Sequence, residues 1–487
     1  MIGIKSYGAY VPLHRLDRSE FFRAWGGIFG MSIPGEKAVA NFDEDSVTMA
    51  VEAAIDCING TDINEVDGLF FATTTSPYKD RLCSGIIAMV LDMRRDVRTM
   101  DVTGSLRAGT TAIVSAIDAI KAGTAANIMV TAADTILAAP AGDFEQAFGD
   151  GSAALLLGSD NVIASVEGSY SVTDEFAGMW RTSDDTFVRS WEDRMILDKG
   201  YSSIMPEVIS GLMNKYGLTT KDFTKMVCDS PLDVRRHARL ARELGFDESQ
   251  VQDPMFMTVG NTGCALAMMM LVAALEEAKV GDKILFASYG NGADAFVLEV
   301  TPEIDKLGYR RGMKNHLASK KSLRNYETYL RWRRLVAIER ALRPELGPTT
   351  IAGQWRDRKL ILGLWGKKCQ ACGTPQIIQG ATLGMGTPTR VCINCQAKDQ
   401  FEGYRFSDKK AKIFTFTQDH LADTLDPPAV ITTVDFEGGG RAIFDMTDRD
   451  PDEVSVEMPV EMTFRKLYYD APRGIHNYFW KTRPVRC

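Results

Sequence analysis

Two stretches of the sequence determine the fold, Gly104-Ser-Leu-Arg-Ala-Gly-Thr-Thr-Ala-Ile-Val114 and Gly260-Asn-Thr-Gly-Cys-Ala-Leu-Ala-Met-Met-Met270. Each is a turn of small residues that leads into an apolar segment typical of a buried helix. In both cases a Lys-x-Gly turn and then an apolar strand follow. A second pair of similar segments begins at Gly149 and Gly290. The sequence therefore predicts a duplicated unit of strands and helices.

Strand and helix signals alternate through the first 305 residues. Strands are predicted at 2–11, 68–75, 127–133 and 151–158, and helices at 45–59 and 110–122. Such alternation is typical of an α/β fold in which helices pack around a largely buried sheet, with some strands paired antiparallel. We expect a first half at residues 1–165 and a second half at residues 166–305.

Four segments carry a resemblance to a known family. They are Asp45-Ser-Val-Thr-Met-Ala-Val-Glu-Ala-Ala54, Asp101-Val-Thr-Gly-Ser-Leu-Arg-Ala-Gly-Thr110, Gly260-Asn-Thr-Gly263 and Ser288-Tyr-Gly-Asn-Gly-Ala293. Residues 1–305 resemble hydroxymethylglutaryl-CoA synthase of the thiolase superfamily, particularly its prokaryotic forms. The resemblance implies a duplicated, five-layered thiolase fold, a homodimer formed through that fold, and a CoA thioester as substrate or ligand.

The positions at which this family carries its catalytic side chains are changed here. The resemblance implies a nucleophilic cysteine five residues after Asp101 and just before the segment Arg107-Ala-Gly-Thr110, but Leu106 holds that position, and leucine cannot be acylated. Thr74 stands where the family has its general-base glutamate, and Asp229 stands where it has a histidine. Of the four expected polar positions, only Asn261 keeps the residue type of the family.

Two interpretations of this altered site remain open. In the first, the site acts on a thioester without a nucleophile, as retro-aldolases of the same superfamily do. Asp229, expected to be half buried, would then take the proton of a β-hydroxyl group, and Ser105, Thr74 or Asn261 would hydrogen-bond the thioester carbonyl. In the second, the domain has lost its chemistry and holds substrate or a catalytic partner.

Other candidate nucleophiles and bases are less favoured. Ser105 is expected to lie next to Leu106 at the start of the same helix. One step along a helix turns a side chain by about 100°, so the Ser105 side chain should point away from the site. No histidine is placed to activate it. His237 falls in a predicted helix, where we expect it on the surface. Cys83 and Cys264 are expected to be ordinary core residues.

The net charge changes sign near residue 305. Residues 1–305 carry 25 basic and 44 acidic side chains, a net of −19, whereas residues 306–487 carry 31 and 20, a net of +11. Residues 306–348 are predicted to be a basic helical linker, with one helix from Tyr326 whose apolar stripe contains Tyr329, Trp332 and Leu335. We expect this linker to dock on the acidic region or on a partner, with the phosphates of CoA as the alternative ligand.

Four of the nine cysteines form two CxxC pairs, Cys369 with Cys372 and Cys392 with Cys395. This pattern indicates a tetrahedral Zn²⁺ held by four thiolates, and because no ligand position stays open, the metal is expected to be structural. Iron in a rubredoxin-like site is the alternative. Residues 349–403 are assigned to this zinc ribbon. The odd number of cysteines argues against a framework of disulfides, which is typical of secreted proteins. Because the sequence also shows no signal-peptide pattern and no membrane span, we expect a cytoplasmic protein.

Short strands dominate residues 404–487 and predict a small barrel of the OB type. The strand signals are Lys412–Thr417, Ala429–Val434, Arg441–Asp445 and Val460–Phe464. The order of basic helices, zinc ribbon and barrel resembles the zinc-ribbon and OB-fold domain that accompanies thiolase-like acyl-CoA enzymes, usually as a separate subunit. This sequence departs from that family at Glu457-Met-Pro459, where a glycine is common.

Together the two resemblances imply a component of an acyl-CoA complex that forms or cleaves carbon–carbon bonds, supporting a cysteine-bearing thiolase partner. The alternative is an autonomous synthase variant or retro-aldolase that uses Asp229 as its base. An OB-fold protein that binds nucleic acid is the least favoured hypothesis, because the −19 region repels phosphates. We expect no nucleic-acid or membrane partner.

Overall fold

The computed structural model describes residues 1–26, 33–176, 178–229, 234–339, 350–377 and 390–486. Its contacts divide the chain into two compact units. The first comprises Met1–Ala40, Asp45–Ala88 and Met93–Tyr329, and the second comprises Asn41–Glu44, Met89–Asp92 and Leu330–Cys487. No helix within the described ranges is long and apolar enough to cross a membrane.

A mixed sheet with the order β11-β12-β13-β8-β1-β7-β6-β4-β5 forms the centre of the first unit. Its strands are β1 (Gly3–Tyr10), β4 (Gly68–Ala72), β5 (Arg98–Val102), β6 (Ile128–Asp134), β7 (Gly151–Gly158), β8 (Ala164–Thr173), β11 (Lys225–Cys228), β12 (Lys283–Tyr289) and β13 (Gly292–Val300). In one half β4 runs parallel to β6, which is antiparallel to β7. In the other half β11 is parallel to β12, which is antiparallel to β13. The predicted duplication is confirmed.

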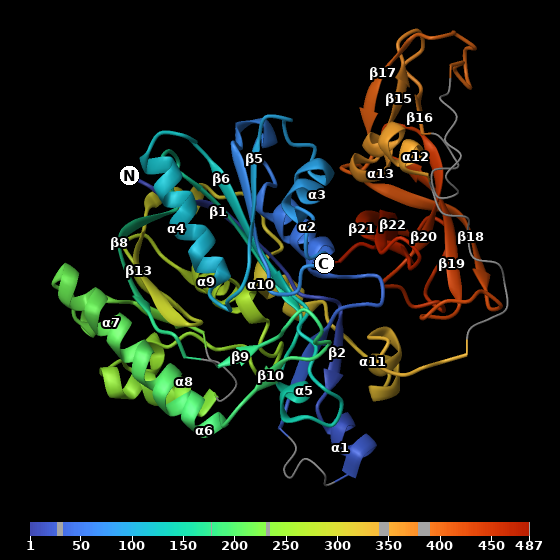
Figure 1. The fold of residues 1–487 in the computed structure, drawn as a ribbon. Helices are drawn as coiled ribbons and strands as arrows, with labels where there is room; N and C mark the ends of the chain where they lie inside the picture. The colour runs from blue at the N-terminus through green and yellow to red at the C-terminus, as the bar shows by residue number, and fades with distance from the viewer. Residues whose placement is uncertain (27–32, 177, 230–233, 340–349, 378–389, 487) are drawn as a thin grey trace. The chain divides into compact units, whose positions relative to one another are not determined.

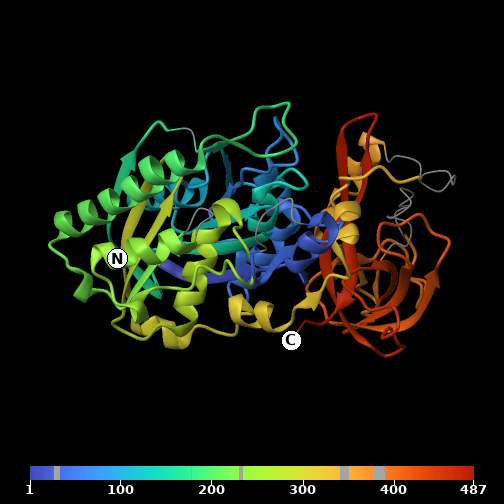
Figure 2. The ribbon, with the colours of Figure 1, turned by 90° about the horizontal axis from the view of Figure 1, so that it is seen from below.

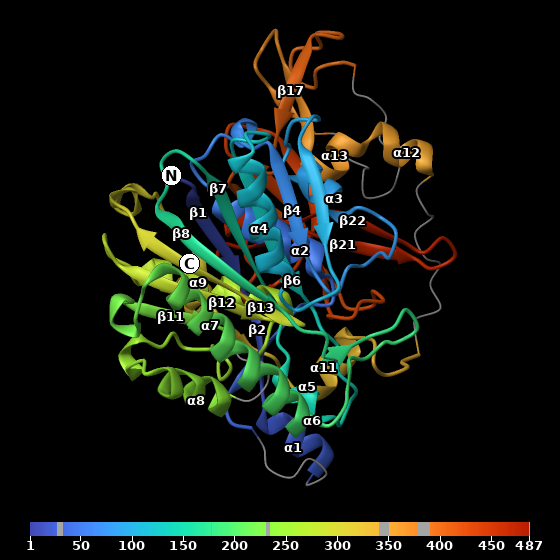
Figure 3. The same ribbon diagram turned by 60° about the vertical axis from the view of Figure 1, so that its left-hand side comes forward.

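Helices separate and cover the two halves of this sheet (Figure 3). They are α2 (Ser46–Cys57), α3 (Cys83–Val90), α4 (Ala108–Lys121), α7 (Ser202–Tyr216), α8 (Val234–Leu244) and α9 (Leu266–Glu277). Helices α4 and α9 share one core with strands from both halves, which explains why α9 is apolar on nearly all sides. Helices α7 and α8 pack on the other face of β11, β12 and β13, and α2 packs on β1, β6 and β7. This arrangement confirms the five-layered thiolase fold.

Smaller elements complete the first unit. They are β2 (His14–Asp17), β3 (Glu36–Val39), β14 (Lys321–Ser322), β9 (Met179–Trp180), β10 (Arg189–Ser190), α1 (Ser19–Trp25), α5 (Asp143–Ala147), α6 (Asp193–Met195) and α10 (Gly312–Ala318). The long helix predicted from Tyr326 is wrong, because α11 ends at Trp332, and Arg334 has a positive φ of 56° that breaks the helix. The buried hydroxyl of Tyr326 donates to the Glu145 carboxylate at 2.8 Å.

The second unit holds a small three-stranded sheet and a closed barrel. Its helices are α12 (Ile351–Arg356) and α13 (Arg358–Gly363), the sheet contains β15 (Trp365–Cys369), β16 (Pro375–Gln376) and β17 (Phe401–Arg405), and the barrel contains β18 (Ala411–Asp419), β19 (Ala429–Phe436), β20 (Arg441–Met446), β21 (Pro459–Asp470) and β22 (Ile475–Pro484). The barrel strands are labelled β18 to β22 in Figure 1 and run from orange to red, as they do in Figure 2. Sequence reasoning missed β22, because its buried Lys481 and Arg483 hide the apolar alternation of a strand.

A cluster of buried charges stabilises the second unit. The guanidinium of Arg465 in β21 contacts carboxylates of Glu44 at 2.5 Å, Asp448 at 2.6 Å and Asp43 at 3.5 Å. The Lys481 ammonium contacts Asp43 at 2.9 Å. Segment Asn41–Glu44, far away in the sequence, thus supplies two of the three acids around Arg465. Basic side chains of the barrel are therefore used inside this unit as structural partners.

We expect Arg465→Met to lower the free energy of unfolding of this unit by about 3–5 kcal/mol, because it leaves three carboxylates buried without their cation. The matched control is Arg441→Met in the same barrel, whose exposed pair with Asp435 at 2.6 Å should contribute far less than the buried cluster. Thermal and urea unfolding of the full chain measure both changes. Equal losses in the two variants would contradict a special role for the buried cluster.

Candidate functional site

A cavity of about 920 Å³ lies in the first unit, where the ends of β4, β11 and β12 meet the turns that precede α4 and α9. Five residues singled out in the sequence line this cavity, although they are spread over almost two hundred positions. They are Thr74, Ser105, Leu106, Asp229 and Asn261. The duplicated fold brings them together because equivalent strand ends and helix starts of its two halves face the same space.

Asp229 follows β11 and presents a buried carboxyl group to the cavity. The Ser288 hydroxyl donates a hydrogen bond to it at 2.8 Å, and the Tyr289 N–H donates another at 3.0 Å. Burial raises the pKa of Asp229 to about 7, although both hydrogen bonds act in the opposite direction. Asp229 is thus more buried than the sequence suggested, and it can exchange a proton near neutral pH.

A second buried aspartate, Asp134, is the last residue of β6 in the first half of the fold, and sequence reasoning missed it. Its carboxylate accepts hydrogen bonds from the hydroxyls of Thr73 (3.0 Å), Thr74 (2.9 Å) and Thr75 (2.8 Å) and from the backbone N–H groups of Thr74 (2.7 Å) and Cys264 (2.9 Å). The Thr74 hydroxyl proton is therefore directed at Asp134. In this arrangement it is not available to a substrate carbonyl.

Gly263 makes the approach of Asp134 to the α9 turn possible. It adopts a positive φ of 59°, and a Cβ atom at this position would overlap the Asp134 carboxylate. The neighbouring Asn261 uses its Oδ1 to accept a hydrogen bond from the Gly263 N–H at 2.9 Å. Its backbone N–H and C=O bond to Ala147 and Gly149. Asn261 therefore shapes the turn that faces the cavity.

Ser105 and Leu106 precede α4, which begins at Ala108, so the expected rotation between them along a helix does not apply. Both residues line the cavity. The Ser105 hydroxyl donates to the Gly290 carbonyl at 2.8 Å, which joins the turns of the two halves. Leu106 packs in an apolar cluster with residues of four other segments, namely Ile136, Phe144, Phe148, Met179 and Val188. Leu106 is thus part of an apolar wall of the cavity.

His237 is buried, with 2% of its surface exposed, so the expectation of a surface position is wrong. Helix α8 turns its apolar side, which contains Leu240 and Ala241, toward α7, and His237 lies on that side. Burial lowers the pKa of His237 to about 4, so the ring is neutral at physiological pH. It does not line the cavity.

The two cysteines considered as candidates are core residues. Burial raises the pKa of Cys83 to about 11 and raises that of Cys264 well above its usual value. Neither thiol belongs to the cavity lining. Among the lining residues that the structure describes, none is a cysteine or a histidine, so the lining offers no thiol and no imidazole that could activate a hydroxyl such as that of Ser105.

A hairpin formed by β9 and β10, which the sequence did not reveal, supplies another part of the cavity lining. Met179, Trp180 and Val188 of this segment face the cavity. The Val188 N–H donates to the Leu137 carbonyl at 2.9 Å, and the Arg181 guanidinium donates to the carbonyl of Thr74. Strands this short carry too little periodicity to be predicted.

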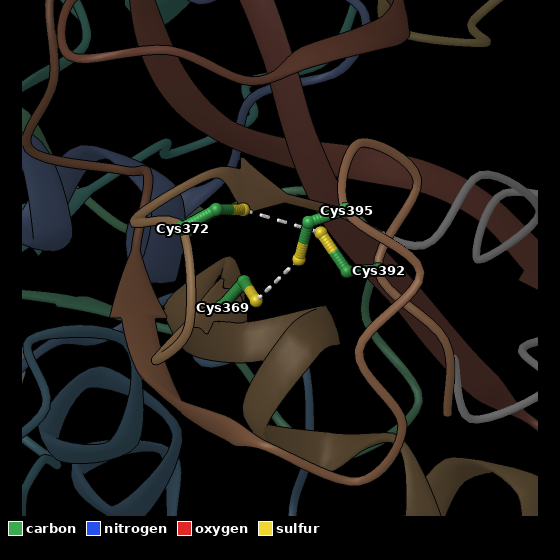
Figure 4. Close-up of side chains that lie close together, drawn as sticks. All are labelled: Cys369, Cys372, Cys392 and Cys395. Carbon is green, nitrogen blue, oxygen red and sulfur yellow. Dashed lines mark hydrogen bonds between the residues drawn. The ribbon is translucent and has the colours of Figure 1, made fainter.

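The four CxxC cysteines form a second candidate site, in the second unit (Figure 4). Their sulfur atoms all lie within 4.8 Å of one another, with 3.7 Å between Cys369 and Cys395 and 3.6 Å between Cys372 and Cys392. Four thiolates at about 2.3 Å from a tetrahedral Zn²⁺ would be about 3.8 Å apart, so this donor set fits zinc. The Thr374 hydroxyl, 3.1 Å from the Cys372 sulfur, lowers the pKa of that thiol and favours the thiolate that a metal needs.

Comparison with known proteins finds one set of relatives for most of the chain and a separate family for the barrel region. Residues 404–465 match the family described as "ChsH2, C-terminal OB-fold domain". The hydroxymethylglutaryl-CoA synthase of Pyrobaculum calidifontis is 31% identical over 348 residues, which cover 69% of this chain and 99% of that protein. The corresponding enzyme of Archaeoglobus fulgidus is 32% identical over 346 residues, again 69% of this chain and 99% of that protein.

Several solved structures share the fold of this chain. A hydroxymethylglutaryl-CoA synthase complexed with CoA superimposes with a TM-score of 0.60 at 18% identity, covering 71% of this chain and 92% of that one. The 3-oxoacyl-[acyl-carrier-protein] synthase III of Aquifex aeolicus has a TM-score of 0.54 at 20% identity, covering 61% and 100%. A synthase of the curacin pathway, solved with an acetyl donor carrier protein, has a TM-score of 0.58 at 20% identity, covering 68% and 88%.

Proposed function

This chain belongs to the hydroxymethylglutaryl-CoA synthase family, and on that basis we propose that it forms or cleaves a carbon–carbon bond next to a CoA thioester without an acyl-enzyme intermediate. The main support is Asp229, a buried carboxyl group whose pKa burial raises to about 7 and which lines a cavity of about 920 Å³. Leu106 at the nucleophile's position makes covalent catalysis of the family type impossible there.

In the cleavage direction, the Asp229 carboxylate accepts the proton of a β-hydroxyl group. The β-carbon becomes a carbonyl, the Cα–Cβ bond breaks, and its electron pair forms the enolate of the remaining thioester. The enolate then takes a proton at the α-carbon, so that a carbonyl compound and a shorter thioester leave. Bond formation is the reverse. Both directions conserve electrons and need no external oxidant or reductant.

Groups around Asp229 fit the two steps that this reaction demands. A pKa near 7 lets the same carboxyl act as base and then as acid at neutral pH. The Ser288 hydroxyl and Tyr289 N–H hold it in place. The backbone N–H of Leu106, for which the described residues offer no acceptor, is a candidate donor to the enolate oxygen.

A second candidate function is support of a cysteine-bearing thiolase within a complex, with the chain itself as a homodimer. It is favoured by the absence of a thiol among the described lining residues and by the second unit, which contains an OB-fold domain of the ChsH2 type. In that case Zn²⁺ held by the four cysteines would stabilise the ribbon from which a partner is bound.

The test uses the full-length, metal-loaded protein with β-hydroxyacyl-CoA substrates. We expect release of a carbonyl compound and a shortened acyl-CoA, detected by chromatography, and no acyl adduct on the intact protein by mass spectrometry. A covalent adduct would contradict the proposed chemistry. Turnover that depends on a thiolase copurified from the host would instead support the second candidate.

A further inference from the structure

We propose that the cavity is built for the bulky, apolar acyl group of a pantetheine thioester, one much larger than acetyl or acetoacetyl. The inference rests on the proposed function, because it names the substrate class of the same cavity. It is carried by the apolar wall around Leu106 and by the size and chemistry of the remaining lining.

The wall is continuous and comes from several distant parts of the chain. Its members both pack against one another and line the cavity; they are Leu106, Ile136, Phe144, Phe148, Met179 and Val188. Leu106 adds an isobutyl group at the position where a family nucleophile would meet a polar thioester. The apolar surface therefore begins beside Ser105 and continues to the β9–β10 hairpin.

Three polar side chains of the lining are engaged with the protein itself. The Ser105 hydroxyl donates to Gly290, the Thr74 hydroxyl donates to Asp134, and the Arg181 guanidinium donates to the Thr74 carbonyl. A polar acyl chain would find few partners along the wall and would lose its hydration without compensation. An apolar chain gains by leaving water.

The size of the cavity points to the same class of ligand. Its volume of about 920 Å³ lies near the upper end of the range of about 300–1,000 Å³ typical of pockets for drug-sized ligands. An acetyl or acetoacetyl group would leave most of the wall exposed to water. A ring system or a medium-length chain attached to the pantetheine arm would cover it.

Binding is measured by calorimetry with the full-length, metal-loaded Asp229→Asn protein, which prevents turnover. The ligands are acetyl-, butyryl-, octanoyl- and dodecanoyl-CoA, and the same acyl groups on pantetheine alone. We expect affinity to rise by about three- to fourfold for each methylene group that enters the cavity, until the cavity is full. If acyl-pantetheines show the same rise in affinity, the rise comes from the acyl group and not from the nucleotide of CoA.

A substitution inside the wall tests the location. We expect Val188→Trp to weaken binding of dodecanoyl-CoA by at least tenfold and to leave acetyl-CoA binding unchanged, because the indole fills space that only a long chain uses. Met179→Trp is a second variant should the first fail to fold. Val280→Trp is the control, since Val280 is 47% exposed and lies outside the cavity lining.

The outcomes separate this inference from the proposed function. Affinity that does not depend on chain length overturns the inference and leaves the proposed chemistry standing. If affinity depends on chain length and Val188→Trp removes this dependence, the inference is supported. If the wild-type protein at the same time shows no turnover of β-hydroxyacyl-CoA, the proposed chemistry is wrong while the inference stands. If none of the thioesters binds, both are wrong.

Discussion

Replacing Asp229 by asparagine is expected to lower kcat for carbon–carbon bond cleavage by about 10²- to 10⁴-fold, the usual contribution of a general acid–base group. The side chains are nearly the same size, and the amide oxygen can still accept the hydrogen bond of the Ser288 hydroxyl. Substrate affinity should therefore change little. Steady-state kinetics with a β-hydroxyacyl-CoA that the wild-type protein cleaves measure the change.

The pH dependence gives a second signature of the same carboxyl group. Because burial raises the pKa of Asp229 to about 7, the carboxylate that acts as base predominates above pH 7, and kcat/KM should rise with pH through that value. Ser288→Ala removes a hydrogen bond that lowers the pKa, so the inflection should move to higher pH. A profile without an inflection near neutral pH would contradict the assignment of Asp229 as base.

A folding control distinguishes lost chemistry from lost structure. With its raised pKa, Asp229 releases its proton more readily in the unfolded chain, so the free energy of unfolding should fall as pH rises from about 4 to 7. Asparagine has no such proton, and the variant should be at least as stable as wild type at pH 8. Asp118→Asn, on the exposed side of α4, is the matched control and should keep full activity.

Removal of the metal is expected to unfold the small sheet of β15, β16 and β17. Structural zinc in comparable four-ligand sites contributes an apparent free energy of about 10–16 kcal/mol, far more than so small a sheet can gain from its apolar contacts. We expect about one zinc ion per chain by elemental analysis. A chelator, or Cys392→Ser, should release it and expose this region to proteolysis.

Cys83→Ser, which changes a thiol outside the cluster, should keep the metal and the protease resistance. A wild-type protein that holds no metal, or a chelated one whose ribbon resists proteolysis as before, would show that the cluster is not a metal site. Iron in the analysis instead of zinc would keep the site and change only its metal.

The candidate cavity was only partly predictable from the sequence. Strand ends and helix starts could be placed, so Thr74, Ser105, Leu106, Asp229 and Asn261 could be named before their meeting place was known. Their catalytic roles stay predictions. Asp134, which accepts hydrogen bonds from three threonine hydroxyls and two backbone N–H groups, was not foreseeable, because its partners lie about 60 and 130 positions away.

By itself, the sequence determined the duplicated α/β fold, four of the five barrel strands and the group of four cysteines. These features depend on spacing within a short stretch, through the periodicity of helices and strands and the reach of a CxxC turn. Only the tertiary structure decided that His237 is buried, that Leu106 belongs to an apolar wall, and that Arg465 meets Glu44. Burial and long-range partners arise when distant segments pack together, and local spacing does not encode which segments these are.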